Sequence, residues 1–340
     1  AIKPFSVVLV IFAALNILGY VHGQKWKTAD SELKILQVQA NIGNLERMYA
    51  EKGKGFRDEI AKKYVQMSET GLAENPDIDL IVWPEVAIPE YLNANYAHQR
   101  NHKLITEFLV RTQKTLLTGA FSKDDKISDP ERSVFNGLFL LDPKGVDLTR
   151  AYHKTELLAF GEYLPFSEKF PILGKILPFV SNFGRGPGPS ILIYPKDAAK
   201  NDYVHIGAQI CYEGLFPEFT VGLASKGAEV MVNVTNDSWF GIPFEPYQHL
   251  YMTLARSIES RRPLIRSTNT GITTFVTAYG DIAPLSPWLK EWTQRQVVPY
   301  RNNPETTFFT RIGHYLWIVI LIAFLGHLLV NGVYDKFRKS

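Results

Sequence analysis

The sequence predicts a layered α/β domain with a membrane-spanning helix on each side of it. Strand-like and helix-like segments alternate through the middle of the chain, and a long uncharged apolar run lies near each end. Hydrophobic residues make up 46% of the 340 residues and charged residues 21%, which is typical of a folded globular chain. The formal net charge of +3, from 37 basic and 34 acidic side chains, is too close to balance to indicate a nucleic-acid partner.

The first apolar run covers residues 4–21 and contains no charged side chain. As a helix it is long enough to cross a hydrocarbon core of about 30 Å. A cleaved signal peptide is the alternative, but the run is long for that role and no small-x-small cleavage site follows it. We therefore expect residues 1–23 to form a transmembrane helix.

The second apolar run covers residues 312–334, is also uncharged, and has aromatic residues near its borders. We expect it to be a second transmembrane helix. The basic segment 335–340 that follows should stay in the cytoplasm under the positive-inside bias. Two crossings with both outer ends inside place residues 24–311 on the far side of the membrane, which in a bacterium is the periplasm.

Between these runs, the periodicity of the apolar residues predicts the elements of the domain in order. A strand at residues 33–40 is followed by a charged amphipathic helix at 47–72 and a buried strand at 79–83. The next elements are a helix at 98–114, strands at 115–121 and 134–141, and a turn at 142–145.

A Pro- and Gly-rich segment at about residues 166–190 then interrupts the pattern. It is apolar but too broken to form a helix throughout, so it is either an irregular loop packed on its own domain or an arm that touches the membrane or covers a lipid-binding cleft. The alternation that resumes after it is typical of helices packed on sheet faces. Its elements are strands at 203–210, 229–234, 264–267 and 273–278, helices at 216–225 and 246–260, and a turn at 280–281.

Reactive side chains lie beside three of the apolar strand patterns, and open α/β sheets gather their active sites at strand ends. Glu85 follows Pro84, which ends its strand, and Lys154 leads a strand-like stretch with Glu162 in a loop after it. Cys211 lies where a strand breaks into a turn and a helix, which exposes a nucleophile to backbone N–H groups. Because Cys211 is the only cysteine, it cannot form an internal disulfide and is either an inert buried thiol or a working one.

The chemistry of a thiol explains why these residue types would be grouped. A free thiol has a pKa of about 8.5 and is only a few per cent thiolate at neutral pH, so it benefits from a base and a cation. Glu85 would take the thiol proton and return it to the leaving group, while Lys154 would stabilise the thiolate. Lys154 would then stabilise an oxyanion beside the backbone N–H that follows Cys211. Each residue alone is more often structural or solvated, so the prediction depends on the three together.

Motifs around these residues occur in the same order as in one known family. They are WPE, HKxxLxxFGEYxPF, ICYE, VNVTNDSWFG and RPLIRSTNTGIT. From about residue 33 to residue 280 the chain resembles the bacterial apolipoprotein N-acyltransferases, which belong to the nitrilase superfamily. The resemblance implies a nitrilase-like αββα sandwich for residues 24–311, in the bacterial inner membrane with the catalytic domain facing the periplasm.

The resemblance also implies the reaction. The thiolate takes an acyl chain from a phospholipid, commonly phosphatidylethanolamine, and the thioester then acylates the N-terminal amine of a diacylglyceryl-cysteine apolipoprotein. By position, Glu85 is implied as the general base, Lys154 as the electrostatic stabiliser and Cys211 as the nucleophile. No cofactor is expected, and the partners are the lipid donor, the apolipoprotein and the membrane, with the protein itself a monomer.

Further positions are implied as supporting residues or as lining of the cleft. Glu213 alone is also compatible with a first-turn helix carboxylate that the helix dipole favours, and Trp239 with a core position. No metal is expected, because the eight histidines show no HExxH or paired-ligand spacing. The supporting residues are Glu162, Tyr212 and Glu213, and the possible cleft-lining residues are Asn236 and Trp239.

A cluster of arginines near residue 264 has two interpretations. Any one of Arg261, Arg262 and Arg266 would either meet a phosphate head group or form a structural ion pair.

The chain departs from the family pattern in two places. Family members carry several membrane helices before the catalytic domain, whereas one is predicted here and the chain begins with Ala1, so we expect a truncated or shortened relative. A tryptophan expected after the first strand is not evident, and Met48 or Tyr49 occupies its neighbourhood. The alternatives to the acyltransferase are a membrane-tethered carbon–nitrogen hydrolase with the same three residues, in which water resolves the acyl-enzyme, and a binding domain without turnover.

Overall fold

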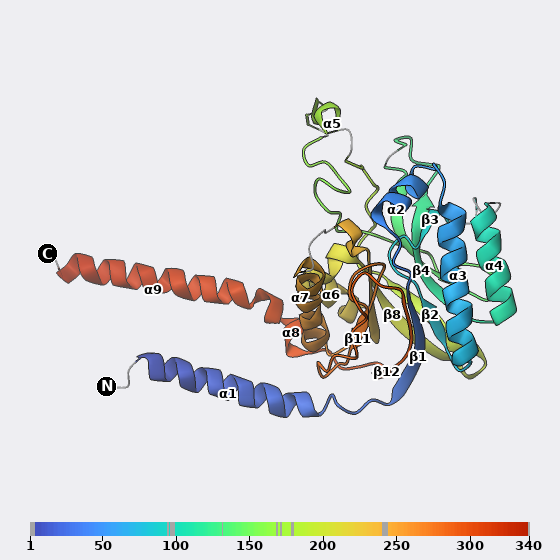
Figure 1. The fold of residues 1–340 in the computed structure, drawn as a ribbon. Helices are drawn as coiled ribbons and strands as arrows, with labels where there is room; N and C mark the ends of the chain where they lie inside the picture. Colours follow the sequence, from blue (N-terminus) through green and yellow to red (C-terminus); the bar gives the residue numbers. More distant parts are fainter. Residues whose placement is uncertain are drawn as a thin grey trace.

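The computed structural model describes residues 4–338 apart from residues 94, 96–98, 131, 168, 171, 178, 179 and 240–243. Two β-sheets face each other at its centre, helices cover their outer faces, and a long helix projects from each end of the chain (Figure 1). The α/β fold class predicted from the sequence is confirmed.

The first sheet contains seven strands and carries two of the predicted reactive residues near its strand ends. Its strands are β1 (Ser31–Gln39), β2 (Leu80–Val82), β3 (Ile88–Tyr91), β4 (Thr115–Lys123), β5 (Val134–Leu141), β6 (Tyr152–His153) and β12 (Trp292–Tyr300). The order is β12-β1-β2-β4-β5-β6, and β3 pairs with β4 outside this path. β1, β2 and β4 are parallel, whereas β12, β5 and β6 are antiparallel to their neighbours.

The second sheet contains five strands in the order β11-β10-β9-β8-β7. They are β7 (Ile191–Asp197), β8 (Asp202–Ile210), β9 (Val230–Thr235), β10 (Leu264–Thr268) and β11 (Thr274–Val276). The three central strands are parallel, with antiparallel strands on both edges. Parallel strands end at the same edge of a sheet, so the residues that follow β8 and β9 lie next to each other.

Successive residues of β1 show how the core is divided. Leu33 and Ile35 belong to the core between the sheets, whereas Leu36 and Val38 face the helices on the outer side. This period of two is the pattern of a strand that is buried on both faces. The outer helices of the first sheet are α2 (Asn44–Glu51), α3 (Arg57–Glu74) and α4 (Arg100–Thr112), and those of the second sheet are α6 (Pro217–Ser225) and α7 (Phe244–Ser260).

The helix predicted at residues 47–72 is wrong in one respect, because the chain forms α2 and α3 there. Gly53 and Gly55 between them have φ angles of 67° and 108°, and Phe56 has a φ of 66°. These left-handed conformations end one helix and redirect the chain before the next. The start predicted for α4, near residue 98, lies outside the described residues.

Four strands were not predicted from the sequence. β12 and β6 are the edges of the first sheet, β7 is an edge of the second, and β3 pairs only with β4. β12 buries only three of its nine residues, Gln296, Val298 and Tyr300. Four polar residues follow Trp292 at its start, so its apolar pattern is weak. Edge strands carry less of the core, and the periodicity that reports burial is weaker there.

The terminal helices are α1 (Pro4–Gln24) and α9 (Leu316–Arg338), which project from the same side of the sandwich in Figure 1. Among the described residues, α1 is the helix that is long and apolar enough to cross a membrane, with a mean hydropathy of 1.9 over Ser6–Gln24. The described apolar part of α9, Leu316–Val330, is shorter. The chain reaches α9 through α8 (Phe308–Arg311), and a membrane position for both ends stays a prediction.

We call residues 166–190 the arm. Its only regular element among the described residues is α5 (Ile172–Ile176), a helix of 5 residues, as the many Pro and Gly residues predict. The arm extends away from the sandwich (Figure 1). Several of its large apolar side chains are exposed, among them Phe166 (70%), Phe170 (57%) and Ile176 (62%). Of the two alternatives left by the sequence, this exposure favours an arm over a loop packed on its own domain.

Candidate active site

The structure brings Glu85, Lys154 and Glu162 together at the ends of strands. Glu85 follows β2, and Lys154 follows β6 directly, so the expectation that Lys154 leads a strand is wrong. The Lys154 Nζ lies 2.7 Å from Glu162 Oε1 and 3.4 Å from Glu85 Oε1. Both Glu85 and Lys154 are buried. Cys211 follows β8 of the facing sheet, and the charges of these three residues all act on its thiol.

The Glu85 carboxylate is held on both oxygens. Lys154 and the Asn136 Nδ2 contact Oε1, the latter at 2.7 Å, and the backbone N–H of Asn236 donates to Oε2 at 2.9 Å. Asn136 also donates to Glu162 Oε1 at 3.2 Å. Asn136 was not predicted as a site residue from the sequence, although an amide side chain inside the apolar strand β5 indicates a buried polar contact. A carboxylate with this many partners is fixed in position before any substrate arrives.

The turn that carries Glu85 lies very close to β4. A Cβ on Gly119 would collide with the backbone of Pro84, Glu85 and Val86. The Gly119 N–H donates to the Pro84 carbonyl at 3.1 Å, so the missing side chain lets the two backbones bond directly. Gly119 is therefore required for the position of Glu85.

Lys154 is a permanently charged group in this structure. Burial disfavours its ammonium form, but the carboxylates of Glu162 and Glu85 outweigh burial and raise the pKa of Lys154. Its backbone is also fixed, because its N–H donates to the Asn136 carbonyl and its carbonyl accepts from the Gly186 N–H. The ammonium is thus a fixed positive charge beside the thiol.

Cys211 has a strained backbone and a protonated side chain. Its φ is 52°, in the left-handed region that residues other than Gly rarely adopt. Its carbonyl accepts a hydrogen bond from Asn233 Nδ2 at 3.0 Å. Burial of the sulfur and the charge of Glu85 raise the pKa of Cys211 to about 12, against the opposite effect of Lys154. Lys154 favours the thiolate as expected, but not enough to form it, so a base must take the proton as the sulfur attacks.

Glu213 joins the turn after β8 to the turn after β6. Its carboxylate accepts hydrogen bonds from the Ile210 N–H at 2.7 Å, the Thr155 N–H at 2.6 Å and the Tyr152 hydroxyl at 2.5 Å. Burial raises the pKa of Glu213 to about 7, even though these donors favour the charged form. These contacts join the residue after Lys154 to the residue before Cys211, so Glu213 is more than a helix-end carboxylate, and its supporting role in the reaction stays a prediction.

The remaining predicted site residues lie near this centre. Tyr212 is partly exposed and packs edge-to-face on Phe216, with ring centroids 4.9 Å apart. Asn236 contacts Glu85 through its backbone N–H. Trp239 ends the short helix η4 (Asp237–Trp239), but its side chain lies outside the described residues, so its lining role stays a prediction.

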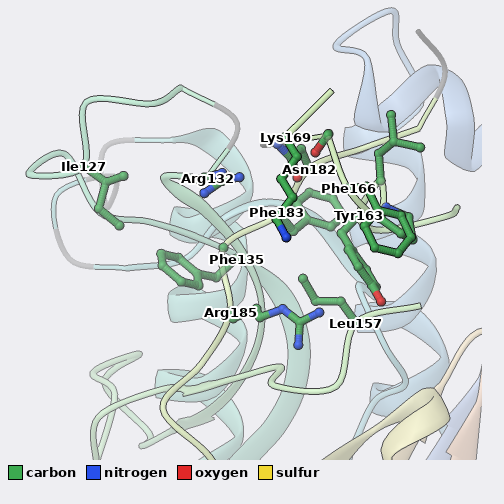
Figure 2. A pocket seen from close by; sticks show the side chains of 14 residues that line it. Ile127, Arg132, Phe135, Leu157, Tyr163, Phe166, Lys169, Asn182, Phe183 and Arg185 are labelled. Carbon is green, nitrogen blue, oxygen red and sulfur yellow. The ribbon is translucent and has the colours of Figure 1, made fainter. Parts of the chain in front are cut away.

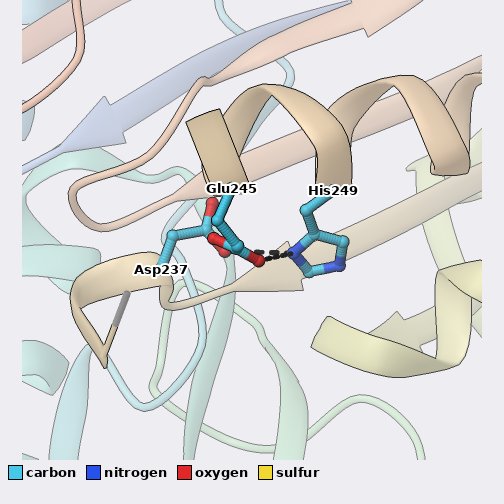
Figure 3. A group of neighbouring side chains, drawn as sticks. All are labelled: Asp237, Glu245 and His249. Atoms are coloured by element: carbon cyan, nitrogen blue, oxygen red, sulfur yellow. Dashed lines mark hydrogen bonds and ion pairs between the residues drawn. The ribbon is translucent and has the colours of Figure 1, made fainter. Parts of the chain in front are cut away.

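A candidate cation site lies beside the centre, formed by Asp237, Glu245 and His249 (Figure 3). Their possible ligand atoms lie within 4.8 Å of one another, and His249 Nδ1 is 3.1 Å from Asp237 Oδ1. The guanidinium of Arg266 pairs with the other oxygen of Asp237 at 3.1 Å. Because this fixed positive charge would repel a metal ion, the three side chains fit an internal ion-pair network better than a metal centre.

Two arginines of the cluster, Arg262 and Arg266, bind partners inside the protein, as the structural interpretation predicts. Arg262 donates to backbone carbonyls, including those of Ala228 and Pro304, and Arg266 binds Asn233 and Asp237. Both side chains are fully buried, so neither guanidinium is available to a lipid head group.

A cavity of about 570 Å³ lies between the base of the arm and the Lys154–Glu162 loop (Figure 2). Aromatic and cationic side chains line it, including Phe135, Tyr163 and Arg185. The Arg185 guanidinium lies 4.7 Å from the centre of the Tyr163 ring. Phe135 directly precedes Asn136 and Tyr163 directly follows Glu162, so two of the segments that line the cavity also carry residues of the reaction centre.

Comparison with known proteins gives a family and a fold. Residues 8–298 match the family model described as carbon-nitrogen hydrolase. The chain is similar to apolipoprotein N-acyltransferases of Bdellovibrio bacteriovorus, at 49% identity over 100% of this chain and 62% of the relative, and of Geobacter metallireducens, at 31% identity over 91% and 56%. It therefore spans about three fifths of the length of these curated relatives.

Two solved structures share the fold at low sequence identity. The carbon-nitrogen hydrolase from Helicobacter pylori aligns with a TM-score of 0.57 at 15% identity, covering 88% of this chain and 98% of that one. Saccharomyces cerevisiae Nit3, a member of the nitrilase superfamily, aligns with a TM-score of 0.54 at 16% identity, covering 80% and 91%. The nitrilase-like form of the sandwich is thereby confirmed.

Proposed function

The chain belongs to the carbon–nitrogen hydrolase family, and within it we propose that this is the catalytic part of an apolipoprotein N-acyltransferase with Cys211 as nucleophile. One observation carries the proposal. Lys154 forms ion pairs with Glu85 and Glu162, and the charges of all three act on the thiol of Cys211, whose backbone is strained, in a chain 49% identical over its full length to a curated enzyme of that name.

In the first half of the proposed reaction, an ester of a phospholipid acylates the thiol. As the Cys211 sulfur attacks the ester carbonyl, Glu85 takes the thiol proton, which the raised pKa of Cys211 makes necessary. The ammonium of Lys154 and the backbone N–H of Tyr212 stabilise the oxyanion. The C–O bond then breaks, and Glu85 returns the proton to the departing alkoxide. The lysophospholipid dissociates, and the acyl chain remains on Cys211 as a thioester.

In the second half, the amine of the acceptor attacks the thioester. Glu85 accepts a proton from the attacking nitrogen, the C–S bond breaks, and the proton passes to the Cys211 sulfur. The products are an amide on the acceptor and the free thiol. The proposed acceptor is the N-terminal amine of a diacylated apolipoprotein, as in the curated relatives' name.

Three features support a donor that resides in a membrane. The cavity beside the Glu162 loop combines aromatic side chains with cations such as Arg185, which suits a molecule with acyl chains and a phosphate. The arm exposes apolar side chains next to it, and α1 is long and apolar enough to anchor the domain. We propose phosphatidylethanolamine as donor and a catalytic domain that faces the periplasm from the inner membrane.

Mass spectrometry of the protein incubated with phosphatidylethanolamine vesicles tests the nucleophile. We expect the mass of one acyl chain on Cys211, removed by neutral hydroxylamine because thioesters are labile to it. Cys211→Ala should carry no adduct and show no transfer. An adduct of equal yield on Cys211→Ala would refute the proposed mechanism.

The same acyl-enzyme could be resolved by water, as in a hydrolase, and the family model makes that the alternative to test. A synthetic diacylated lipopeptide with a free N-terminal amine is offered to the loaded protein. We expect the triacylated peptide. Release of free fatty acid alone would support a membrane-tethered hydrolase with the same reaction centre.

A further inference from the structure

Arg266 is a fully buried arginine in β10, outside the group of residues that the proposed mechanism uses. Its Nη1 donates to Asn233 Oδ1 at 2.8 Å, and its Nη2 pairs with Asp237 Oδ2 at 3.1 Å. Asn233 and Asp237 are themselves buried. One guanidinium therefore holds two side chains, one on β9 and one in the turn that follows it.

The first contact leads to the nucleophile. Because a guanidinium can only donate, it fixes the Asn233 amide with its oxygen toward Arg266 and its nitrogen toward Cys211. That nitrogen donates to the Cys211 carbonyl at 3.0 Å. The φ of 52° at Cys211 is costly for a residue with a side chain, so the turn needs restraints of this kind.

The second contact leads to the base. Asp237 directly follows Asn236, whose backbone N–H donates to Glu85 Oε2 at 2.9 Å. His249 Nδ1 at 3.1 Å and the Thr235 hydroxyl at 3.2 Å hold the other oxygen of Asp237. The Asp237 carboxylate is thus fixed at both oxygens, and with it the direction of the neighbouring N–H.

We propose that Arg266 is a positioning residue that fixes the nucleophile, Cys211, relative to the base, Glu85. Through Asn233 it orients the Cys211 turn, and through Asp237 it keeps the Asn236 N–H on Glu85. The names nucleophile and base rest on the proposed function. The two hydrogen-bonded paths themselves are features of the structure.

The test compares Arg266→Lys with Arg262→Lys in the full chain. Arg262 is a matched control because it is also fully buried and bonded internally, but to backbone carbonyls away from the centre. The first measurement is the rate of Cys211 alkylation by iodoacetamide at pH 8, with the midpoint of thermal unfolding for each variant. Asn233→Ala and the double variant with Arg266→Lys complete the set.

We expect Arg266→Lys to change the alkylation rate by about threefold or more, in the same direction as Asn233→Ala. The effects in the double variant should be less than additive, because part of the Arg266 effect passes through Asn233. Arg262→Lys should alkylate like the unchanged protein even if it lowers the unfolding midpoint as much. Equal alkylation of Arg266→Lys and Arg262→Lys, or fully additive effects in the double variant, would overturn the proposal.

The second measurement is the rate of thioester formation as a function of donor concentration. Without the Asn236 N–H, one oxygen of the Glu85 carboxylate loses the hydrogen bond that fixes it. Arg262→Lys is again the control.

In Arg266→Lys we expect thioester formation at saturating donor to fall about 10- to 100-fold, with the KM for donor little changed. A fall no larger than that in Arg262→Lys would overturn the path to Glu85. If the unchanged protein forms no thioester at all, the proposed function fails, and the alkylation rates alone decide the role of Arg266.

Discussion

The reaction centre and the arm lie next to each other and are built in opposite ways. At the centre, buried charges such as Glu85 and Lys154 have fixed partners on the ends of strands. In the arm, apolar side chains such as Phe166 and Ile176 are 70% and 62% exposed, around a helix of only 5 residues. The difference suggests a division of labour in which the sandwich positions the chemistry and the arm meets the lipid.

Burial of charge explains why the centre needs the sandwich. A buried ammonium or carboxylate is costly unless it is paired and hydrogen-bonded. Lys154 satisfies this condition with two carboxylates, and Asn136 contacts both of them. Such a network requires atoms to stay within about 3 Å of each other, which strand ends anchored in a core provide and an exposed segment does not.

The largest expected effect comes from Glu85→Gln, which should change the rate of acyl transfer and the rate of Cys211 alkylation in opposite directions. We expect acyl transfer to fall about 10²- to 10⁴-fold, because the general base is lost. Alkylation of Cys211 by iodoacetamide should become faster at pH 8 to 9, because the Glu85 charge helps to raise the pKa of the thiol.

Both rates are measured on the same preparation of Glu85→Gln. Glu107→Gln is the control, since Glu107 lies exposed on α4. A parallel fall of transfer and alkylation would mean that Glu85 supports the fold of the site without acting as the base.

A second, smaller effect is expected from the arm. Replacing Phe166 and Ile176 by Ser should lower kcat/KM for phospholipid in vesicles about tenfold, or about 1.4 kcal/mol. The two side chains enter the lipid only in part, so together they lose less than the roughly 1.5–3 kcal/mol that full burial of each would contribute. Alkylation of Cys211 should not change, since Phe166 and Ile176 are exposed and the bond from the Gly186 N–H of the arm to the Lys154 carbonyl is kept.

The control for the arm is Val146→Ser, at a side chain 58% exposed in the turn after β5. It removes an exposed apolar group of the sandwich instead of the arm. If Val146→Ser lowers kcat/KM as much as the arm variant, the arm has no special role in donor uptake.

The smallest effect concerns stability and Glu213. Its pKa is raised from 4.5 to about 7, so the folded chain binds this proton more tightly than the unfolded chain does. The stabilisation from this proton is therefore complete below about pH 4.5 and is lost as pH rises through 7, a change of at most about 3 kcal/mol. Glu213→Gln stays neutral, so it should destabilise the chain more at pH 5 than at pH 8.

Thermal unfolding of the unchanged protein and of Glu213→Gln, each at pH 5 and at pH 8, measures this difference in stability. Glu245 also has a pKa raised to about 7, by burial and by Asp237, and stays unchanged in both proteins, so its contribution cancels in the comparison. A gap between the two unfolding midpoints that widens toward pH 8 would contradict the raised pKa of Glu213.

The sequence predicted the central strands well because they are buried on one or both faces, and burial leaves a regular apolar pattern. β5 occupies the predicted residues 134–141, and β4 and β8 lie close to their predicted ranges. The edge strands β7 and β12 were missed because they bury fewer residues. The division between α2 and α3 depends on left-handed glycines, whose φ angles a helical pattern of charges does not reveal.

The sequence alone determined which side chains have the chemistry for a reaction centre, and it placed Glu85 and Cys211 after strands. Only the tertiary structure decided which groups meet, because Glu85 and Lys154 come from one sheet and Cys211 from the other. The tertiary structure also decided the protonation of the thiol, since its pKa depends on burial and on three charges distant in sequence. Contacts such as Asn136 with Glu85 and Arg266 with Asp237 leave no local pattern, because their strength comes from the buried space in which they meet.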